Sequence, residues 1–240
     1  MNTKIVDWQG AQMEALATAR TEAELYTVLT STARDLGFDY VAFGLRQPLP
    51  LSNPKTHMVN NYPSEWQERY VREGYLAVDP TVVHGIRSVT PLVWTDTLFR
   101  SAPTFWEDAH AHGIRYGWAQ SHYDAQGSVG MLTVARSHEL VTESELRDKS
   151  LRLSWLVQAV HEQMGRLVSA KQPPLPSVAL TAREVEVLRW TADGKTSGEI
   201  GQIMDISERT VNFHINNSLE KLGAVNKTAG VIKAAMLRLL

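Results

Sequence analysis

The stretch SGEIGQIMDISERTVNFHINNSLEKL, residues 197–222, decides the fold of the C-terminal part of this 240-residue chain. The three residues Asp205-Ile206-Ser207 leave room only for a tight turn, and Ser207 is suited to cap the helix that follows. Apolar residues recur at helical spacing on both sides of this turn. The stretch therefore predicts two short helices joined by a turn.

The second of these helices has two chemically different faces. Core positions are expected on one face of each helix: Ile200, Ile203 and Met204 in the first, and Val211, Ile215, Leu219 and Leu222 in the second. The opposite face of the second helix carries Arg209, Asn212, Phe213, Asn216 and Asn217. Arginine suits guanine, asparagine suits adenine and an apolar group suits the thymine methyl, so this face fits a DNA groove. On periodicity alone, a generic helical hairpin in an all-α domain remains the alternative.

Length and composition indicate a globular protein of two domains. The chain has 240 residues, 43% of them hydrophobic, which is enough for packed cores. It has no cysteine, which excludes disulfides and thiolate metal sites. The start, MNTKIVDWQG, lacks the apolar run of a signal peptide, and no stretch approaches the ~20 apolar residues that span a bilayer. We therefore expect a soluble cytoplasmic protein without a membrane partner.

The charge is divided unevenly along the chain. The formal net charge is −2, but residues 177–240 hold 8 Lys and Arg against 7 Asp and Glu, whereas residues 1–170 hold 15 against 19. The C-terminal part is therefore weakly basic. One such copy neutralises few DNA phosphates, so its affinity for DNA is expected to be low. DNA binding is therefore expected to need a dimer, in which the contacts of two copies add together.

The N-terminal part mixes helices and strands without strict βαβ alternation. Helical spacing, with capping-box patterns at Thr21 and Thr142, predicts helices over residues 22–36, 64–73, 103–112 and 142–167. Short apolar runs predict strands over residues 40–45, 56–59, 91–94, 118–123 and 129–135, the last two as an antiparallel pair. Asp79 is expected to cap a helix that begins at Pro80. These elements predict an α+β fold, an α-β-α sandwich with an antiparallel sheet like that of GAF and PAS sensory domains.

A proline-rich spacer separates this part from the DNA-facing helices. The stretch KQPPLPS, residues 171–177, favours extended conformations. We expect a first domain over residues 1–168, a linker over 169–177 and a second domain over 178–240. A capping-box pattern at Thr181 and a last helix over 227–239 bring the second domain to four helices. It is therefore expected to be an all-α helix-turn-helix domain.

Three motifs that resemble enzyme or metal sites each lack a necessary part. The tripeptide GKT at 194–196 resembles the end of a phosphate-binding loop, but Arg189 stands where that loop needs glycine. His110 and His112 have no further ligand at metal-binding spacing. The pair Ser121-His122 lacks a third catalytic partner. We therefore expect neither catalysis nor a metal or cofactor site.

Aromatic side chains and one acid are concentrated in a short part of the first domain: Tyr62, Trp66, Tyr70, Asp79, Trp94, Phe105 and Trp106. Such aromatics usually fill a core, and this remains the alternative. However, buried Tyr and Trp need partners for their polar tips, and a buried Asp needs a donor. A small amphipathic ligand with an amide N–H and carbonyl oxygens would satisfy these groups together in an apolar pocket.

The chain resembles the LuxR-type quorum-sensing transcription factors, which bind acyl-homoserine lactones. The resemblance rests on motifs that follow one another along nearly the whole chain: NYPSEW (61–66), VDPTV (78–82), PLVW (91–94), FWEDAHAHGI (105–114), GMLTVAR (130–136), LTARE (180–184) and ISERTVNFHI (206–215). The C-terminal motifs alone are typical of the wider class of such helix-turn-helix modules. The N-terminal motifs make the ligand-binding interpretation specific.

By this resemblance, four polar side chains bind the head of the lactone ligand. Trp66 donates its indole N–H to the lactone carbonyl, and Asp79 accepts the amide N–H. Tyr62 donates to the amide-side carbonyl, assisted by Thr133. The other ligand-binding positions pack around the lactone or leave room for the acyl chain: Tyr70, Trp94, Phe105, Ala109, Ile114, Ala42 and Gly44. The length of that chain and its 3-position substituent stay open, because pocket volume is not given by a sequence.

The resemblance also implies a homodimer on a palindromic DNA site. Ligand binding would stabilise the first domain, and the long helix over 142–167 would pair two copies. Two second helices would then face two half-sites of double-stranded DNA. The DNA-contacting positions are Arg209, Thr210, Asn212, Phe213 and Asn216 for bases and Lys195 and Lys221 for phosphates, with RNA polymerase as a further candidate partner. Two alternatives stay open: a ligand-independent regulator of the same fold, and a lactone hydrolase or acylase.

Overall fold

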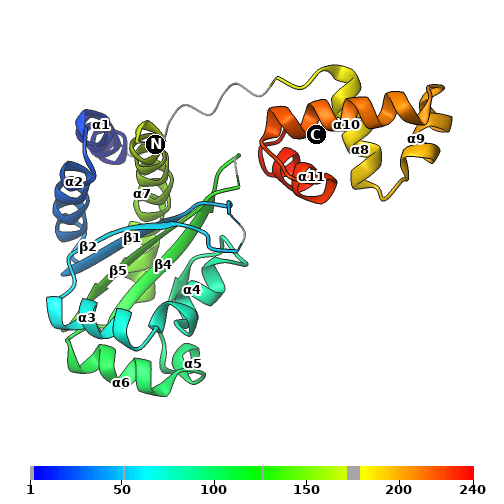
Figure 1. Cartoon of the computed structure of the whole chain (residues 1–240). Helices are drawn as coiled ribbons and strands as arrows, with labels where there is room; N and C mark the ends of the chain where they lie inside the picture. Colours follow the sequence, from blue (N-terminus) through cyan, green and yellow to red (C-terminus); the bar gives the residue numbers. More distant parts are fainter. Residues whose placement is uncertain (1–2, 51, 126, 172–178) are drawn as a thin grey trace. The chain divides into compact units, whose positions relative to one another are not determined.

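The structure, a computed structural model, describes residues 3–50, 52–125, 127–171 and 179–240. The chain divides into two compact units, which consist mainly of residues 3–171 and 179–240. Figure 1 shows the helices and strands of both units. From position 172 onward, the expected linker over 169–177 lies outside the described residues. No helix in the described ranges is both long and apolar enough to cross a membrane.

A five-stranded antiparallel sheet forms the centre of the N-terminal unit, as predicted (Figure 1). Its strands are β1 (Tyr40–Arg46), β2 (Thr56–Asn60), β3 (Leu92–Val93), β4 (Tyr116–Tyr123) and β5 (Val129–Arg136). They lie in the order β2-β1-β5-β4-β3, and every neighbouring pair is antiparallel. The pairing of β1 with β5 joins segments far apart in the sequence, with Tyr40 opposite Ala135 and Arg46 opposite Val129.

One face of the sheet is covered by α2 (Glu22–Asp35) and α7 (Glu143–Ala170), and α1 (Thr3–Thr18) packs against these two helices (Figure 1). Alternate residues of β1 point into this layer, where Val41, Phe43 and Leu45 are fully buried. Helix α7 contributes the apolar stripe that its sequence predicts: Leu153, Leu156, Val157, Val160 and Met164 are buried, and Leu146 is partly buried. These side chains form the aliphatic core of the unit.

The opposite face of the sheet carries shorter helices: α3 (Ser64–Arg72), the 3-10 turn η1 (Tyr75–Ala77), α4 (Pro80–Gly85), α5 (Asp96–Phe99) and α6 (Pro103–Ala111) (Figure 1). They bury a second cluster that is largely aromatic: Trp66, Tyr75, Phe99 and Phe105. Asp79 caps α4 as predicted, because its side chain accepts a hydrogen bond from the Thr81 N–H and Pro80 begins the helix. The two faces of the sheet therefore differ in chemistry.

Helix α1 is not among the helices predicted from local patterns in the sequence. Packing against α7 and α2 holds it in place instead. The Trp8 ring lies edge-on to the Trp155 ring with centroids 5.6 Å apart, and Leu16 is buried in the aliphatic core. Tertiary contacts thus determine this helix.

The capping box predicted at Thr142 is only half formed. The Thr142 hydroxyl accepts the Glu145 N–H, but the Glu145 carboxylate turns to the Arg136 guanidinium, at 2.8 Å from Nη1 and 2.7 Å from Nη2. The guanidinium also donates to three carbonyls: those of Gly37, Glu139 and Leu140. Burial alone would raise the pKa of Glu145, but hydrogen bonds from Arg136 and Lys149 outweigh it and lower the pKa to about 2. The predicted box at Thr21 is likewise half formed, because the Glu24 carboxylate accepts a different backbone N–H.

The C-terminal unit consists of four helices, as predicted: α8 (Ala182–Ala192), α9 (Ser197–Met204), α10 (Glu208–Leu222) and α11 (Lys227–Met236). Ser207 caps α10, and Thr181 forms a complete capping box with Glu184. A second complete box, which the sequence analysis misses, joins Thr196 and Glu199 at the start of α9. The turn between α9 and α10 passes through Asp205 in the left-handed conformation, with φ of 53°.

The buried side of α9 differs from the expected one at a single position. Ile200 and Met204 pack against Val211 and Ile215 of α10, as predicted. Ile203 is 47% exposed, so the prediction that it is buried is wrong. The inward row of α9 instead follows positions i, i+3, i+4 and i+7: Ser197, Ile200, Gly201 and Met204. Gly201 is required there, because a Cβ would lie 2.7 Å from the Ile206 carbonyl oxygen of the turn.

Candidate functional sites

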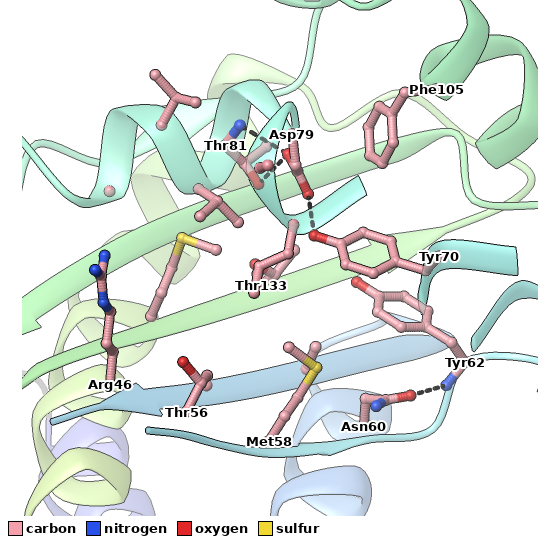
Figure 2. A pocket seen from close by; sticks show the side chains of 18 of the residues that line it. Arg46, Thr56, Met58, Asn60, Tyr62, Tyr70, Asp79, Thr81, Phe105 and Thr133 are labelled. Atoms are coloured by element: carbon pink, nitrogen blue, oxygen red, sulfur yellow. Dashed lines mark hydrogen bonds between the residues drawn. The ribbon is translucent and has the colours of Figure 1, made fainter. Parts of the chain in front are cut away.

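A cavity of about 550 Å³ lies between the aromatic side of the sheet and the segments α3, η1, α4 and α6. Its volume is in the range of pockets for small molecules. All eleven ligand-binding residues predicted from the sequence line it: Ala42, Gly44, Tyr62, Trp66, Tyr70, Asp79, Trp94, Phe105, Ala109, Ile114 and Thr133. Figure 2 shows part of this lining. The fold thus brings together residues that are up to 91 positions apart in the sequence.

Three rows of residues cross the cavity side of the sheet, and strand register fixes their order. Read from β1 through β5 to β4, the first row is Ala42, Thr133 and Ala119, the second is Gly44, Met131 and Ser121, and the third is Arg46, Val129 and Tyr123. Strand β2 adds Asn60, Met58 and Thr56 to the same three rows. Successive rows are two residues apart along a strand, which corresponds to about 7 Å.

Asp79 is a buried carboxylate in the cavity wall, only 8% exposed. Its Oδ1 accepts the Thr81 N–H at 2.8 Å and the Thr81 hydroxyl at 2.7 Å, and its Oδ2 accepts the Tyr70 hydroxyl at 3.1 Å (Figure 2). Burial raises the pKa of Asp79 above its ordinary value, and these hydrogen bonds offset part of the rise. Within the described residues no cation pairs with it. A further donor from a ligand would therefore be a strong partner.

The tyrosine hydroxyls near Asp79 are protonated, and two donors at this end of the cavity are available for a ligand. Burial, and secondarily the negative charge of Asp79, raises the pKa of both Tyr62 and Tyr70 well above the ordinary tyrosine value. The Trp66 ring is buried against Tyr70 and Phe105. In the part of the chain that the structure describes, the Trp66 indole N–H and the Tyr62 hydroxyl hydrogen-bond to no other residue. One end of the cavity thus presents two free donors beside a carboxylate acceptor.

Two polar side chains that line the cavity, Thr81 and Ser121, are not among the ligand-binding residues predicted from the sequence. Thr81 is buried and holds Asp79 in position through two hydrogen bonds, and its place two residues after a helix-capping Asp is the signal that could have identified it. The Ser121 hydroxyl and the Trp94 indole N–H line the cavity and are buried without a partner among the described residues. No signal in the sequence distinguishes Ser121 from ordinary strand residues, whereas Trp94 is already one of the predicted ligand-binding residues.

The predicted DNA-facing residues of α10 differ in their solvent exposure and in their hydrogen bonds within the protein. Arg209 and Asn216 are exposed, and the Phe213 ring is 60% exposed although it is apolar. The Asn212 amide oxygen accepts the Ser197 hydroxyl at 2.8 Å, which ties α10 to α9. Thr210 is half-buried, and its hydroxyl lies 2.8 Å from that of the cap residue Ser207. Arg209, Phe213 and Asn216 are therefore the side chains of this set that are most accessible to a partner.

The two predicted phosphate contacts also differ. Lys195 is exposed, between α8 and α9. The Lys221 ammonium lies 2.7 and 2.9 Å from the two carboxylate oxygens of Glu184, whose side chain is 3% exposed. Lys221 therefore neutralises a buried acid in α8, so its charge is largely committed within the protein.

A unit with a buried small-molecule cavity and a second unit with a helix-turn-helix define a class of protein, the ligand-sensing DNA-binding regulator. Residues 21–164 match the family described as the autoinducer binding domain, and residues 178–234 match the bacterial regulatory proteins of the luxR family. The transcriptional activator protein AnoR of Acinetobacter nosocomialis is 46% identical over 235 residues, which cover 97% of this chain and 99% of AnoR.

Two solved structures are also similar. The crystal structure of Escherichia coli SdiA has a TM-score of 0.79 and 34% identity, and the match covers 98% of each chain. The N-acylhomoserine lactone-dependent factor CepR2 of Burkholderia cenocepacia has a TM-score of 0.64 and 31% identity, over 72% of this chain and all of that one. The chain therefore belongs to the LuxR family and is a quorum-sensing transcriptional regulator with an autoinducer-binding and a DNA-binding domain. Its relatives are named as transcriptional regulators, in agreement with the expectation that it is not an enzyme.

Proposed function

We propose that the autoinducer is an N-acyl-homoserine lactone and that the liganded protein binds a palindromic promoter element as a homodimer. One observation carries this proposal: the buried carboxylate of Asp79 lies beside the free donors of Trp66 and Tyr62. Among the described residues, no cation forms an ion pair with this carboxylate. An acyl-homoserine lactone has one amide N–H and two carbonyls, so it matches one acceptor and two donors. The lactone dependence stated for CepR2 supports the same class of ligand.

In the proposed complex each polar group of the ligand has one partner. The amide N–H donates to Asp79, the lactone carbonyl accepts the Trp66 indole N–H, and the amide carbonyl accepts the Tyr62 hydroxyl, with Thr133 in the first row beside it. Tyr70, Trp94, Phe105, Ala109 and Ile114 enclose the ring, and Ala42 and Gly44 leave space for the chain. The lactone thus supplies partners for groups whose burial is otherwise costly.

The proposed dimer follows from the weak charge of the C-terminal unit. Its net charge of +1 offers few phosphate contacts per copy, so two copies on two half-sites are needed for useful affinity. Helix α7 is the candidate pairing element, because the exposed Leu151 lies on the side of the helix away from the aliphatic core. A promoter-bound dimer would act in the cytoplasm, with RNA polymerase as its partner.

Adding a lactone to the purified full-length chain is expected to raise its melting temperature and its affinity for operator DNA. At a concentration one hundred times its dissociation constant, a ligand stabilises the folded state by about 2.7 kcal/mol, or roughly 5–10 °C in a protein of this size. Thermal melts and DNA mobility shifts with hexanoyl to tetradecanoyl lactones measure both. Equal operator binding without any lactone would indicate a ligand-independent regulator, and ring-opened product in mass spectra would indicate a hydrolase.

Changing Asn216 to alanine is expected to reduce operator selectivity and to leave lactone binding intact. Asn216 is exposed on α10 and is proposed to read a base, and loss of one such contact costs about 1–3 kcal/mol against the cognate base pair. Competition between operator and scrambled DNA measures the selectivity. The matched control is Asn53→Ala, an exposed asparagine of the N-terminal unit. Unchanged selectivity in Asn216→Ala would remove this residue from the base-reading set.

A further inference from the structure

We infer that Arg46 limits the acyl chain of the ligand to about eight to ten carbons. This inference rests on the proposed function, because it takes the ligand to be an acyl lactone with its amide beside Asp79. It adds a specificity-determining residue that the sequence analysis does not include among the ligand-binding positions.

Arg46 lies at the end of the cavity opposite to the polar head site. Thr133 and Ala42 stand in the first row, next to the proposed amide position, and Arg46 stands in the third row. Figure 2 shows Arg46 at one end of the lining and Phe105 and Tyr70 toward the other. A chain that leaves the head site along the strands therefore passes the second row before it reaches Arg46.

The strand register also gives the distance between the head site and Arg46. The third row is four residues from the first, or about 13 Å along the strand. A methyl group stops about 4 Å short of the atoms that it contacts, which leaves roughly 9–10 Å for the chain. C–C bonds of about 1.5 Å that meet at about 111° advance about 1.25 Å each, so roughly seven or eight bonds fit. Counted from the carbonyl carbon, the chain then has about eight or nine carbons, and slight bending admits a tenth.

Apart from the Ser121 hydroxyl, the second row along this path is apolar. Gly44, Met58 and Met131 line the second row, and a Cβ on Gly44 would only make ordinary contacts, at 3.9 Å from Thr56 and 4.0 Å from Met58. Gly44 therefore leaves the path open. Arg46 is the first charged side chain that a growing chain meets. It is half-buried and forms no ion pair with any described residue, so an alkyl chain against its guanidinium would remove water without supplying a partner.

The chain cannot pass easily to the side of Arg46. Tyr123, in the same third row, donates its hydroxyl to the backbone carbonyls of Gly85 and Ile86 at the end of α4. The contact between α4 and β4 is close, because a Cβ on Gly85 would lie 2.4 Å from the Ser121 hydroxyl oxygen. Helix α4 thus closes over the sheet on that side, and the space beyond the second row leads toward Arg46.

The test is a chain-length series on the full-length protein. Dissociation constants are measured by competition for unsubstituted hexanoyl, octanoyl, decanoyl, dodecanoyl and tetradecanoyl lactones. For the wild type, affinity is expected to rise by about fourfold per methylene, or 0.8 kcal/mol, up to the octanoyl or decanoyl ligand and to fall beyond it. In Arg46→Met, which keeps a long side chain without charge, the tetradecanoyl-to-octanoyl affinity ratio is expected to rise at least tenfold.

Two further variants separate charge from size and from general effects. Arg46→Lys keeps the charge and is expected to keep the wild-type ratio, and Arg72→Met removes an exposed arginine of α3 outside the cavity and should do the same. A wild-type affinity that still rises through the tetradecanoyl lactone would overturn the inference without any variant. An identical ratio in Arg46→Met and wild type would also overturn it. If no lactone binds the wild type, the proposed function fails first, and this inference fails with it.

Discussion

Changing Asp79 to asparagine is expected to raise the lactone concentration for half-maximal response by about 30-fold or more. The physical reason is the loss of a charged hydrogen bond at a buried site, which costs about 2 kcal/mol or more. The fold should tolerate the change, because asparagine is as good a helix cap as aspartate and can still accept the Thr81 N–H. The measurement is a lactone titration of operator binding.

The pH dependence of lactone binding provides an independent check on Asp79. Its raised pKa means that the unliganded folded state holds the proton more tightly than the unfolded chain does. The stability that this group contributes is therefore greatest below its ordinary pKa and falls as the pH rises through the raised value. An amide N–H bonds more strongly to the ionised carboxylate than to the protonated one, so wild-type lactone affinity should fall as the pH is lowered through the raised pKa. Asp79→Asn should lack this fall.

A matched control for Asp79→Asn is Asp35→Asn, which makes the same chemical change at an exposed position at the end of α2. Its half-maximal lactone concentration should equal that of the wild type. A wild-type value in Asp79→Asn as well would show that this carboxylate does not bind the ligand.

Changing Glu145 to alanine is expected to destabilise the N-terminal unit by about 3 kcal/mol, because it leaves the Arg136 guanidinium buried without its bidentate partner. The Arg136 side chain is 6% exposed, so water cannot replace the carboxylate. Urea denaturation followed by tryptophan fluorescence measures the loss. Six of the seven tryptophans lie in residues 1–171, so the signal reports mainly on this unit.

The control for Glu145 is Glu143→Ala, two residues earlier in the first turn of α7 with its side chain 95% exposed, for which a change within about 0.5 kcal/mol is expected. The stability that Glu145 contributes also depends on the pH. Because the folded-state pKa of Glu145 is lowered to about 2, its contribution is fully present above its ordinary pKa of about 4.5 and is lost as the pH falls toward 2. Equal stability of Glu145→Ala and wild type at neutral pH would contradict the structural role given to this ion pair.

Local patterns in the sequence are sufficient to predict most of the fold. Strand alternation, helix caps and the proline break at residues 79–80 predict elements that the structure contains with nearly the same bounds. The failures have tertiary causes. Helix α1 depends on packing against α7, and Glu145 leaves its expected cap because Arg136, at the end of a strand, is a stronger partner. Periodicity within a single segment contains neither fact.

The candidate cavity could be predicted only in part for the same reason. The aromatic residues and Asp79 are close in sequence and chemically unusual together, so they could be nominated as one site. Arg46 and Ser121 reach the cavity through the pairing of β5 with β1 and β4. Register between strands that lie far apart is set by the whole sheet, and a one-residue slip would place both side chains on the other face.

The alternation along β1 has a consequence for how such a regulator can change over time. Val41, Phe43 and Leu45 belong to the aliphatic core, whereas Ala42, Gly44 and Arg46 line the cavity. Substitutions at the even-numbered positions can thus alter which signal is accepted while the residues that hold the sheet to α2 and α7 stay the same. Strand β1 therefore carries its core residues on one face and its ligand-facing residues on the other. A descendant of this protein can respond to a new signal and still fold in the same way.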